Sequence, residues 1–408
     1  MTHPHDDVRE HAADHGRRGP LRAAVRLALA ATLVAALGAL VLGVPGGERG
    51  HHRGVETGAA PGAALKGLPR LTSRTYPWPG AAPAPQPPAA PARGATDIGF
   101  SPGFDILYQP EAELHRDLAA MRALGMRRLR VDLSWAFVER QRGRYDWSAN
   151  DRVFGAARAA GLQVLAVVGY APSWATSSAG TPDAAGFADF VSAAARRYGP
   201  TVAAWEIWNE PNLERFWDAP DPEGYARLVA AAAPRLAALD PAAAVVVGSL
   251  APAVDARDGS QISPETFLRR FYAALPRPLP RGLFDAVSVH PYSYPALPAG
   301  DEEWNTFARL PEIREVMVQA GDSRSRVWLT EYGAPTGTSD RAVSTGLQSR
   351  MLVEAVREAR RLPFVSALYL YSYRDAGSSP GDPEANFGVV RADGGAKPAL
   401  AALRRALR

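Results

Sequence analysis

Short apolar runs alternate with amphipathic stretches from residue 96 to residue 408. The apolar runs are rich in β-branched and aromatic residues, and they predict strands at 97–101, 127–133, 162–170, 202–210, 244–250, 284–292, 326–332 and 367–373. The intervening stretches carry apolar residues at helical spacing, and they predict helices at 110–124, 148–160, 183–198, 222–238, 264–275, 303–320, 339–361 and 397–408. Near-continuous apolar strands are typical of a parallel sheet covered on both faces.

Eight strand–helix units within residues 96–408 predict a single (β/α)8 barrel, an α/β fold. Residues suited to helix ends support these boundaries: Ser148, Asp183 and Asp340 near the starts, and Gly125, Gly161 and Gly321 after the ends. A doubly wound open sheet is the alternative. It is disfavoured because no glycine-rich turn follows the first predicted strand.

The N-terminal quarter has a different character. Arg22 and Arg26 precede an uncharged apolar run at 27–44, which is long enough to span a bilayer as a helix. We predict a signal anchor, with residues 1–26 as a cytoplasmic tail and basic flank. A cleaved signal peptide and a buried core helix remain alternatives. A signal anchor would export the barrel and keep it on the membrane, and a cleaved signal peptide would secrete it. Residues 45–95 contain ten prolines among Gly and Ala and predict a linker.

Composition narrows the chemistry. The chain has no cysteine, which excludes disulfides, a thiol nucleophile and thiolate metal sites. Its 46 Lys and Arg nearly balance 42 Asp and Glu, and no basic run is interleaved with aromatic residues, so we expect no nucleic-acid partner. The residue spacings predict no metal site, no phosphate loop and no cofactor. We expect a monomer.

In a (β/α)8 barrel the active site lies at the carboxyl ends of the strands. The polar residues at those ends are Asp132 or Ser134, Tyr170, Asn209, Glu210, His290, Tyr292, Glu331, Tyr371 and Tyr373, and Trp135 and Trp174 begin two of the loops. Two carboxylates, Glu210 and Glu331, would therefore face each other among aromatic rings. Glycoside hydrolysis needs such a pair, and flat rings pack well against the C–H faces of sugars.

Several segments resemble clan A glycoside hydrolases, especially the cellulase-like families 5 and 39. They are WEIWNEPN at 205–212, VSVHPYS at 287–293, LTEYG at 329–333, APSWA at 171–175 and FGVVRADGGAKPALAAL at 387–403. The resemblance covers roughly residues 96–408. It implies a (β/α)8 barrel that cleaves O-glycosidic bonds of a poly- or oligosaccharide with retention of configuration.

The resemblance also implies roles for individual residues. Glu210 would be the acid/base, Glu331 the nucleophile, and Asn209 a partner of the sugar 2-hydroxyl group. Tyr292 would donate a hydrogen bond to Glu331, His290 would line the pocket, and Arg130 would lie beneath the nucleophile and keep it ionised. Trp135, Trp174 and Tyr371 are candidate sugar platforms, although many members have Trp at the position of Tyr371. A retaining pair predicts carboxylates about 5–5.5 Å apart.

Other interpretations remain open. We expect Glu206 to be a structural carboxylate paired with an Arg, about 13 Å deeper in the barrel than Glu210 by strand spacing. The chain could instead be a non-catalytic carbohydrate-binding envelope protein, or a transglycosylase that uses the same two glutamates. Xylosidase or iduronidase activity is possible. No β-sandwich follows the last predicted helix, which favours the single-barrel form.

Overall fold

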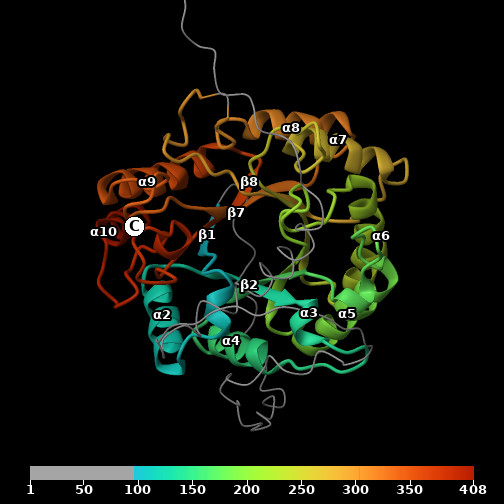
Figure 1. The fold of residues 1–408 in the computed structure, drawn as a ribbon, viewed down its shortest axis with the longest axis horizontal. Helices are drawn as coiled ribbons and strands as arrows, with labels where there is room; N and C mark the ends of the chain where they lie inside the picture. Colours follow the sequence, from blue (N-terminus) through green and yellow to red (C-terminus); the bar gives the residue numbers. More distant parts are fainter. Residues whose placement is uncertain (1–95, 303) are drawn as a thin grey trace, which may run out of the picture. The chain divides into compact units, whose positions relative to one another are not determined.

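Eight parallel strands pair in chain order and close on themselves in the computed structural model, which describes residues 96–302 and 304–408 (Figure 1). The strands are β1 (Asp97–Phe100), β2 (Arg128–Ser134), β3 (Gln163–Gly169), β4 (Val202–Ile207), β5 (Ala244–Leu250), β6 (Ala286–Val289), β7 (Arg326–Tyr332) and β8 (Val365–Leu370). Hydrogen bonds from β1 to both β2 and β8 close the barrel. The predicted (β/α)8 fold is confirmed, and the open sheet is excluded.

The helices form a ring around the strands (Figure 1). They are α2 (Glu111–Ala123), α4 (Ser148–Ala159), α5 (Ala184–Tyr198), α6 (Pro222–Leu239), α7 (Pro264–Ala274), α8 (Leu310–Gln319), α9 (Thr345–Arg361) and α10 (Pro398–Ala406), with a short α3 (Trp135–Val138) after β2. Their apolar faces and the outward side chains of the strands form the main core. This layer holds the strands in register and so fixes the positions of the groups at their ends.

The predicted tail at 1–26, membrane segment at 27–44 and linker at 45–95 lie outside the described residues. Among the helices that the structure does describe, none combines the length and apolarity needed to cross a bilayer.

The inward side chains of the barrel are apolar toward its amino-terminal end. A separate interior cluster consists of Leu165, Ala204, Val246, Ala286, Trp328, Ala367 and Tyr369. Because side chains alternate along a strand, the next inward positions on β4 and β6 are Glu206 and Ser288, both fully buried. The interior thus changes from apolar to polar toward the carboxyl ends.

Helix boundaries follow the local sequence. Gly125, Gly161 and Gly321 follow helices with φ of 89°, 72° and 89°, so these predicted stops are confirmed. The predicted starts of two later helices were wrong. Helix α8 begins at Leu310 and not at 303, since Pro311 suits a first turn and not a helix interior. Helix α9 begins at Thr345 because Ser344 Oγ, and not Asp340, caps it by accepting from Leu347 N at 3.1 Å.

Three strands end three residues earlier than predicted. Strand β4 stops at Ile207 and not at residue 210, because Trp208 and Glu210 have φ of 69° and 45° and leave the extended conformation. Strand β6 ends at Val289, before His290, and β8 ends at Leu370, before Tyr371. The candidate site residues of these three strands therefore lie on the first residues of the following loops.

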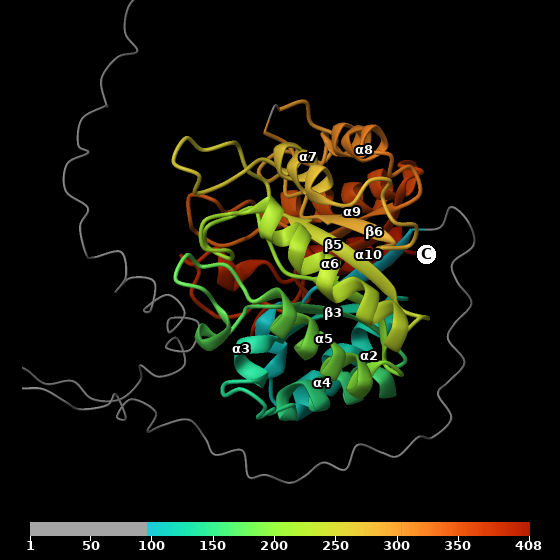
Figure 2. The same ribbon diagram turned by 90° about the vertical axis from the view of Figure 1, so that its right-hand side faces the viewer.

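The loops that follow the strands gather at one end of the barrel, on the left in Figure 2. The longest of them connect β3 to α5 (170–183), β4 to α6 (208–221), β5 to α7 (251–263), β6 to α8 (290–309) and β8 to α10 (371–397). They surround the end of the barrel where the polar groups begin.

Candidate active site

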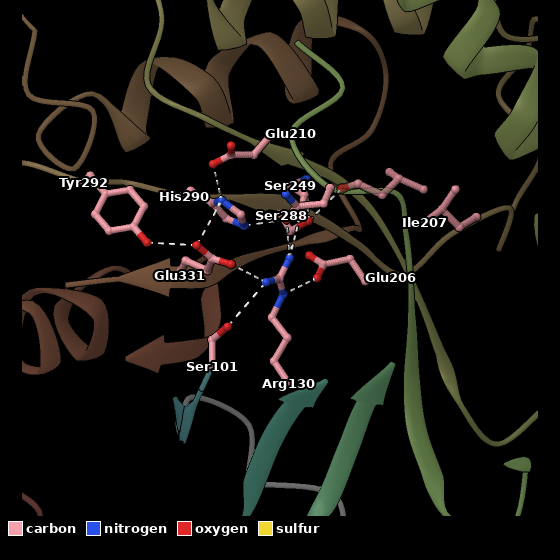
Figure 3. Close-up of polar contacts among 12 residues, drawn as sticks. Ser101, Arg130, Glu206, Ile207, Glu210, Ser249, Ser288, His290, Tyr292 and Glu331 are labelled. Atoms are coloured by element: carbon pink, nitrogen blue, oxygen red, sulfur yellow. Dashed lines mark hydrogen bonds and ion pairs between the residues drawn. The ribbon is translucent and has the colours of Figure 1, made fainter. Parts of the chain in front are cut away.

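The guanidinium group of Arg130, on β2, connects the site (Figure 3). Arg130 Nε donates to Glu206 Oε2 at 2.6 Å, and Nη1 donates to Glu331 Oε1. Nη2 donates to Asn209 Oδ1 at 2.8 Å and to Ser249 Oγ at 3.1 Å. One side chain thereby links β2 with β7 and with the carboxyl-terminal ends of β4 and β5.

Arg130 is only 3% exposed, so its charge needs compensation. Burial alone would lower the pKa of Arg130, but attraction to Glu206 and Glu331 outweighs burial and raises it. The group is therefore a permanent cation. The planar guanidinium can direct donors to several acceptors at once, which suits this position.

Glu210 and Glu331 converge on one imidazole nitrogen. His290 Nδ1 lies 2.8 Å from Glu210 Oε1 and 3.7 Å from Glu331 Oε2. His290 is fully buried, and its Nε2 lies 3.3 Å from Ser249 Oγ. The backbone of Glu210 is held from the same side, since its N–H donates to Ser249 O at 3.1 Å. His290 thus fixes the position of one carboxylate relative to the other.

Glu331 lies in an environment that stabilises its ionised form. Tyr292 Oη donates to Glu331 Oε2 at 2.8 Å, while Arg130 donates to the other oxygen. Burial would raise the pKa of Glu331, but attraction to His290 and Arg130 and the hydrogen bond from Tyr292 outweigh it, so the pKa is lowered. The carboxylate is charged and, with its side chain 15% exposed, remains accessible.

The two carboxylates are close together. One oxygen of Glu210, one of Glu331 and a ring nitrogen of His290 all lie within 4.8 Å of one another. An inverting glycosidase needs a gap of about 6.5–9.5 Å between its carboxyl groups to admit a water molecule, whereas a retaining pair is about 5–5.5 Å apart. The observed approach is compatible with direct attack by one carboxylate.

The same three ligand atoms could hold a divalent ion, although their spacing along the chain predicts no metal site. Arg130 competes with such an ion for Glu331, because it already donates to that carboxylate. An ion here would also occupy the oxygens that an acid/base and a nucleophile need free. The arrangement is therefore better suited to carboxylate chemistry than to metal-assisted hydrolysis.

Asn209 lies in the cluster, and its two amide atoms are engaged differently. Its Oδ1 accepts from Arg130 Nη2 at 2.8 Å, which orients the side-chain amide. Within residues 96–302 and 304–408, Asn209 Nδ2 has no hydrogen-bond partner. It remains available to donate to a bound ligand.

The three predicted sugar platforms differ in exposure. Tyr371 is half-buried and packs edge-on against Phe387 at 5.0 Å. Trp174 is also half-buried, with Arg142 5.0 Å from the centre of its ring. Trp135 is fully buried, and its Nε1 donates to Glu139 Oε2 at 2.7 Å. The geometry gives Trp135 no surface for a sugar, so we leave it out of the proposed contacts: it supports the loop that carries Trp174, with the two rings 5.5 Å apart.

Glu206 pairs with an Arg as expected, but the expected depth of about 13 Å does not apply, because β4 ends at Ile207. Glu206 and Glu331 instead contact the same guanidinium. Fully buried, Glu206 keeps its Oε1 without a hydrogen-bond partner among the described residues. Glu206 compensates the charge of Arg130, and its complete burial excludes it as a contact for a ligand.

Sequence reasoning missed Ser249 and Ser101. Ser249 contacts both Arg130 and His290, and Ser101 Oγ accepts from Arg130 at 3.4 Å. A signal was present for the first, since Gly248 and Ser249 interrupt an otherwise apolar strand. Both residues have positive φ, 110° and 57°, so the strand changes direction there and directs the serine toward the site.

Comparisons with known proteins support the architecture. No family model matches the sequence, and no curated protein sequence is significantly similar to it. Among solved structures, the chain is similar to a family 39 glycoside hydrolase from Bacteroides cellulosilyticus WH2, at 23% identity and a TM-score of 0.61 over 77% of this chain and 64% of that one. It is also similar to a GH39 enzyme from Xanthomonas axonopodis pv. citri, at 22% identity and a TM-score of 0.59, covering 77% and 66% of the two chains.

A GH5_18 protein from Streptomyces cattleya, in complex with GlcNAc, is similar at 17% identity and a TM-score of 0.60, over 78% of this chain and 80% of that one. The chain spans less than two thirds of the length of the first two structures. At these identities the similarity establishes the fold: residues 96–408 adopt the barrel seen in glycoside hydrolases of families 39 and 5.

Proposed function

We propose that this protein is a retaining glycoside hydrolase in which Glu331 is the nucleophile and Glu210 the acid/base. The observation that carries the proposal is the pair of carboxylates held on His290 Nδ1, one of them also paired with Arg130 and Tyr292. The asymmetry of their contacts supports this division of roles. Glu331 is held as an anion by two donors, whereas Glu210 has no Arg partner within the described part of the chain.

The reaction would proceed by double displacement. A Glu331 oxygen attacks the anomeric carbon while the protonated Glu210 gives its proton to the departing glycosidic oxygen. The sugar is then esterified to Glu331, and Glu210 is an anion. In the second step Glu210 takes a proton from water, the water oxygen attacks the anomeric carbon, and Glu331 leaves as a carboxylate. The second step therefore restores protonated Glu210 and ionised Glu331 for the next turnover.

The surrounding groups suit this chemistry. The free amide Nδ2 of Asn209 can donate to the sugar 2-hydroxyl, a contact that strengthens as the ring flattens toward the transition state. Tyr371 and Trp174 offer half-buried ring faces. The proposed substrate is accordingly a poly- or oligosaccharide, and nothing in this set of contacts requires a cofactor.

Trapping experiments test the assignment of the nucleophile. The substrate panel should include β-linked aryl xylosides and mannosides, because similar solved structures include a β-xylosidase from Caulobacter crescentus CB15 and an exo-β-1,4-mannosidase. A 2-fluoro sugar with a good leaving group should inactivate the enzyme over time and add its mass to a peptide containing Glu331. Labelling of a different carboxylate would refute the proposed mechanism.

Replacing Tyr292 by Phe tests the electrostatics of Glu331. The change removes a donor to the ionised form, so the pKa of Glu331 should rise and the acid limb of kcat/KM should move to higher pH. A hydrogen bond to a charged group contributes about 1.5–3 kcal/mol, so we expect kcat/KM to fall by about tenfold or more. Tyr294→Phe is the control, since Tyr294 packs on Tyr292 at 5.9 Å but has no bond to Glu331. If the acid limb of kcat/KM lay at the same pH in the wild type, Tyr292→Phe and Tyr294→Phe, the role of Tyr292 would be contradicted.

We also propose that the apolar run at 27–44 carries the barrel across a membrane and anchors or releases it there. The support is the length of the run and its flanking Arg22 and Arg26. Fractionation of intact cells, followed by protease treatment, would distinguish an anchored barrel from a secreted one.

A further inference from the structure

Asp132 is a third carboxylate at the end of the barrel where Glu331 lies. It is on β2, two residues beyond Arg130, and pairs with Val167 of β3. The same strand parity turns both side chains inward. Within residues 96–302 and 304–408, the Asp132 carboxylate makes no hydrogen bond or ion pair, whereas its backbone pairs with β3 and its backbone oxygen accepts from Asn150 Nδ2. The carboxylate therefore remains free to accept a hydrogen bond from a bound ligand.

The surroundings of Asp132 disfavour its ionised form. Burial raises the pKa of Asp132 to about 6, and repulsion by Glu331 and Glu206 acts in the same direction. Attraction to Arg130 and His290 acts against this shift, but Arg130 already donates to both of those glutamates. Burial outweighs the attraction, so an ionised Asp132 destabilises the folded state.

The geometry of strand β2 places Asp132 close to Glu331. Arg130, two residues earlier on the strand and with the same inward parity, donates through Nη1 to Glu331 Oε1. In a double displacement the nucleophile holds the retained sugar, and the acid faces the leaving group. Asp132 therefore lies on the side of the retained sugar.

We propose that Asp132 binds hydroxyl or amino groups of the sugar retained on Glu331, so that this subsite accepts neutral and amino sugars and rejects uronic acids. This inference rests on the proposed hydrolase function. A carboxylate can only accept hydrogen bonds, and sugar hydroxyl and ammonium groups supply donors. A uronate would bring another negative charge next to Asp132 and Glu331, with Arg130 already shared.

Binding of paired ligands tests the proposal without knowledge of the natural substrate. The probes are piperidine iminosugars of gluco and manno configuration, each with a hydroxymethyl group and with a carboxylate in its place. We expect calorimetry on the full chain to show at least tenfold weaker binding of the carboxylate member. Equal binding of the two members, or preference for the carboxylate, overturns the proposal, while trapping at Glu331 still tests the hydrolase mechanism separately.

The variant Asp132→Asn isolates the charge. In this variant, the affinity for the hydroxymethyl iminosugar relative to its carboxylate counterpart should fall by at least tenfold. Glu111→Gln, an exposed change on α2, should leave this affinity ratio unaltered. Burial raises the pKa of Asp132 to about 6, so at pH 7.5 we expect the folded protein to carry a charge that burial disfavours. Asp132→Asn should therefore raise the melting temperature at that pH. An unchanged ratio, or a lower melting temperature, shows that Asp132 is structural.

Discussion

Glu331→Gln should abolish turnover of β-linked aryl glycosides while leaving the barrel folded. The amide is nearly isosteric with the carboxylate, but it is uncharged and a poor nucleophile, so the first displacement fails. Loss of one member of a covalent catalytic unit costs on the order of 10⁴–10⁶ in turnover in other hydrolases, and we expect a loss of at least about 10⁴-fold here. Steady-state rates over a range of substrate concentrations measure this change.

Glu210→Gln is the informative partner of that variant. It should slow hydrolysis of substrates with poor leaving groups far more than hydrolysis of activated aryl glycosides, because an activated leaving group departs without a proton. Glu206→Gln provides a comparison with a carboxylate that contacts Arg130 but does not reach the pair. Full activity of Glu331→Gln would refute the assignment of the nucleophile. The same leaving-group dependence in Glu210→Gln and Glu331→Gln would refute the division of roles.

Arg130→Met should be the most destabilising single change in the site. It removes the cation that compensates Glu206, which is fully buried, and Glu331, which is largely buried. Breaking a buried ion pair by removing one partner typically costs about 3–5 kcal/mol, and we expect a loss of that size in the free energy of unfolding at neutral pH. Chemical denaturation followed by circular dichroism measures it. Activity should also fall, since Glu331 loses a donor.

Two further variants identify the origin of that loss. Glu206→Gln in the Arg130→Met background should restore part of the stability, because it removes one of the two uncompensated charges. Arg128→Met, on the same strand, breaks the pair with Asp97, whose side chain is 19% exposed, and should cost less. If Arg128→Met were as damaging as Arg130→Met, or Glu206→Gln gave no recovery, packing would explain the loss better than charge.

The fold was predictable because the barrel repeats one simple pattern. Each strand is an apolar run and each helix an amphipathic one, so the order of elements can be derived without knowing any contact. The strand-end rule then predicted that Glu210, His290, Tyr292 and Glu331 would meet, and the structure brings them together. The prediction of Arg130 beneath the nucleophile came instead from resemblance, since an Arg inside a strand has many possible partners.

The remaining details depend on backbone conformation and on packing, which strand patterns do not encode. The positive φ values of Trp208, Glu210 and Ser249 end or bend strands, so spacing arguments failed for Glu206 and overlooked Ser249. The exposure of a tryptophan depends on what covers it, and Trp135 is covered by its neighbours Trp174 and Phe190. The free carboxylate of Asp132 becomes visible only when every donor around it can be assigned.

Arg130 has a consequence for how such a protein can change over time. Its partners come from distant parts of the chain, yet none lies far out on the loops that border the opening. Those loops can therefore lengthen, shorten or exchange side chains without disturbing the position of Glu331. The guanidinium, by contrast, contacts both Glu331 and the buried Glu206, so it affects reactivity and stability together. Changes in the loops could therefore alter substrate preference during evolution, whereas loss of Arg130 would also destabilise the fold.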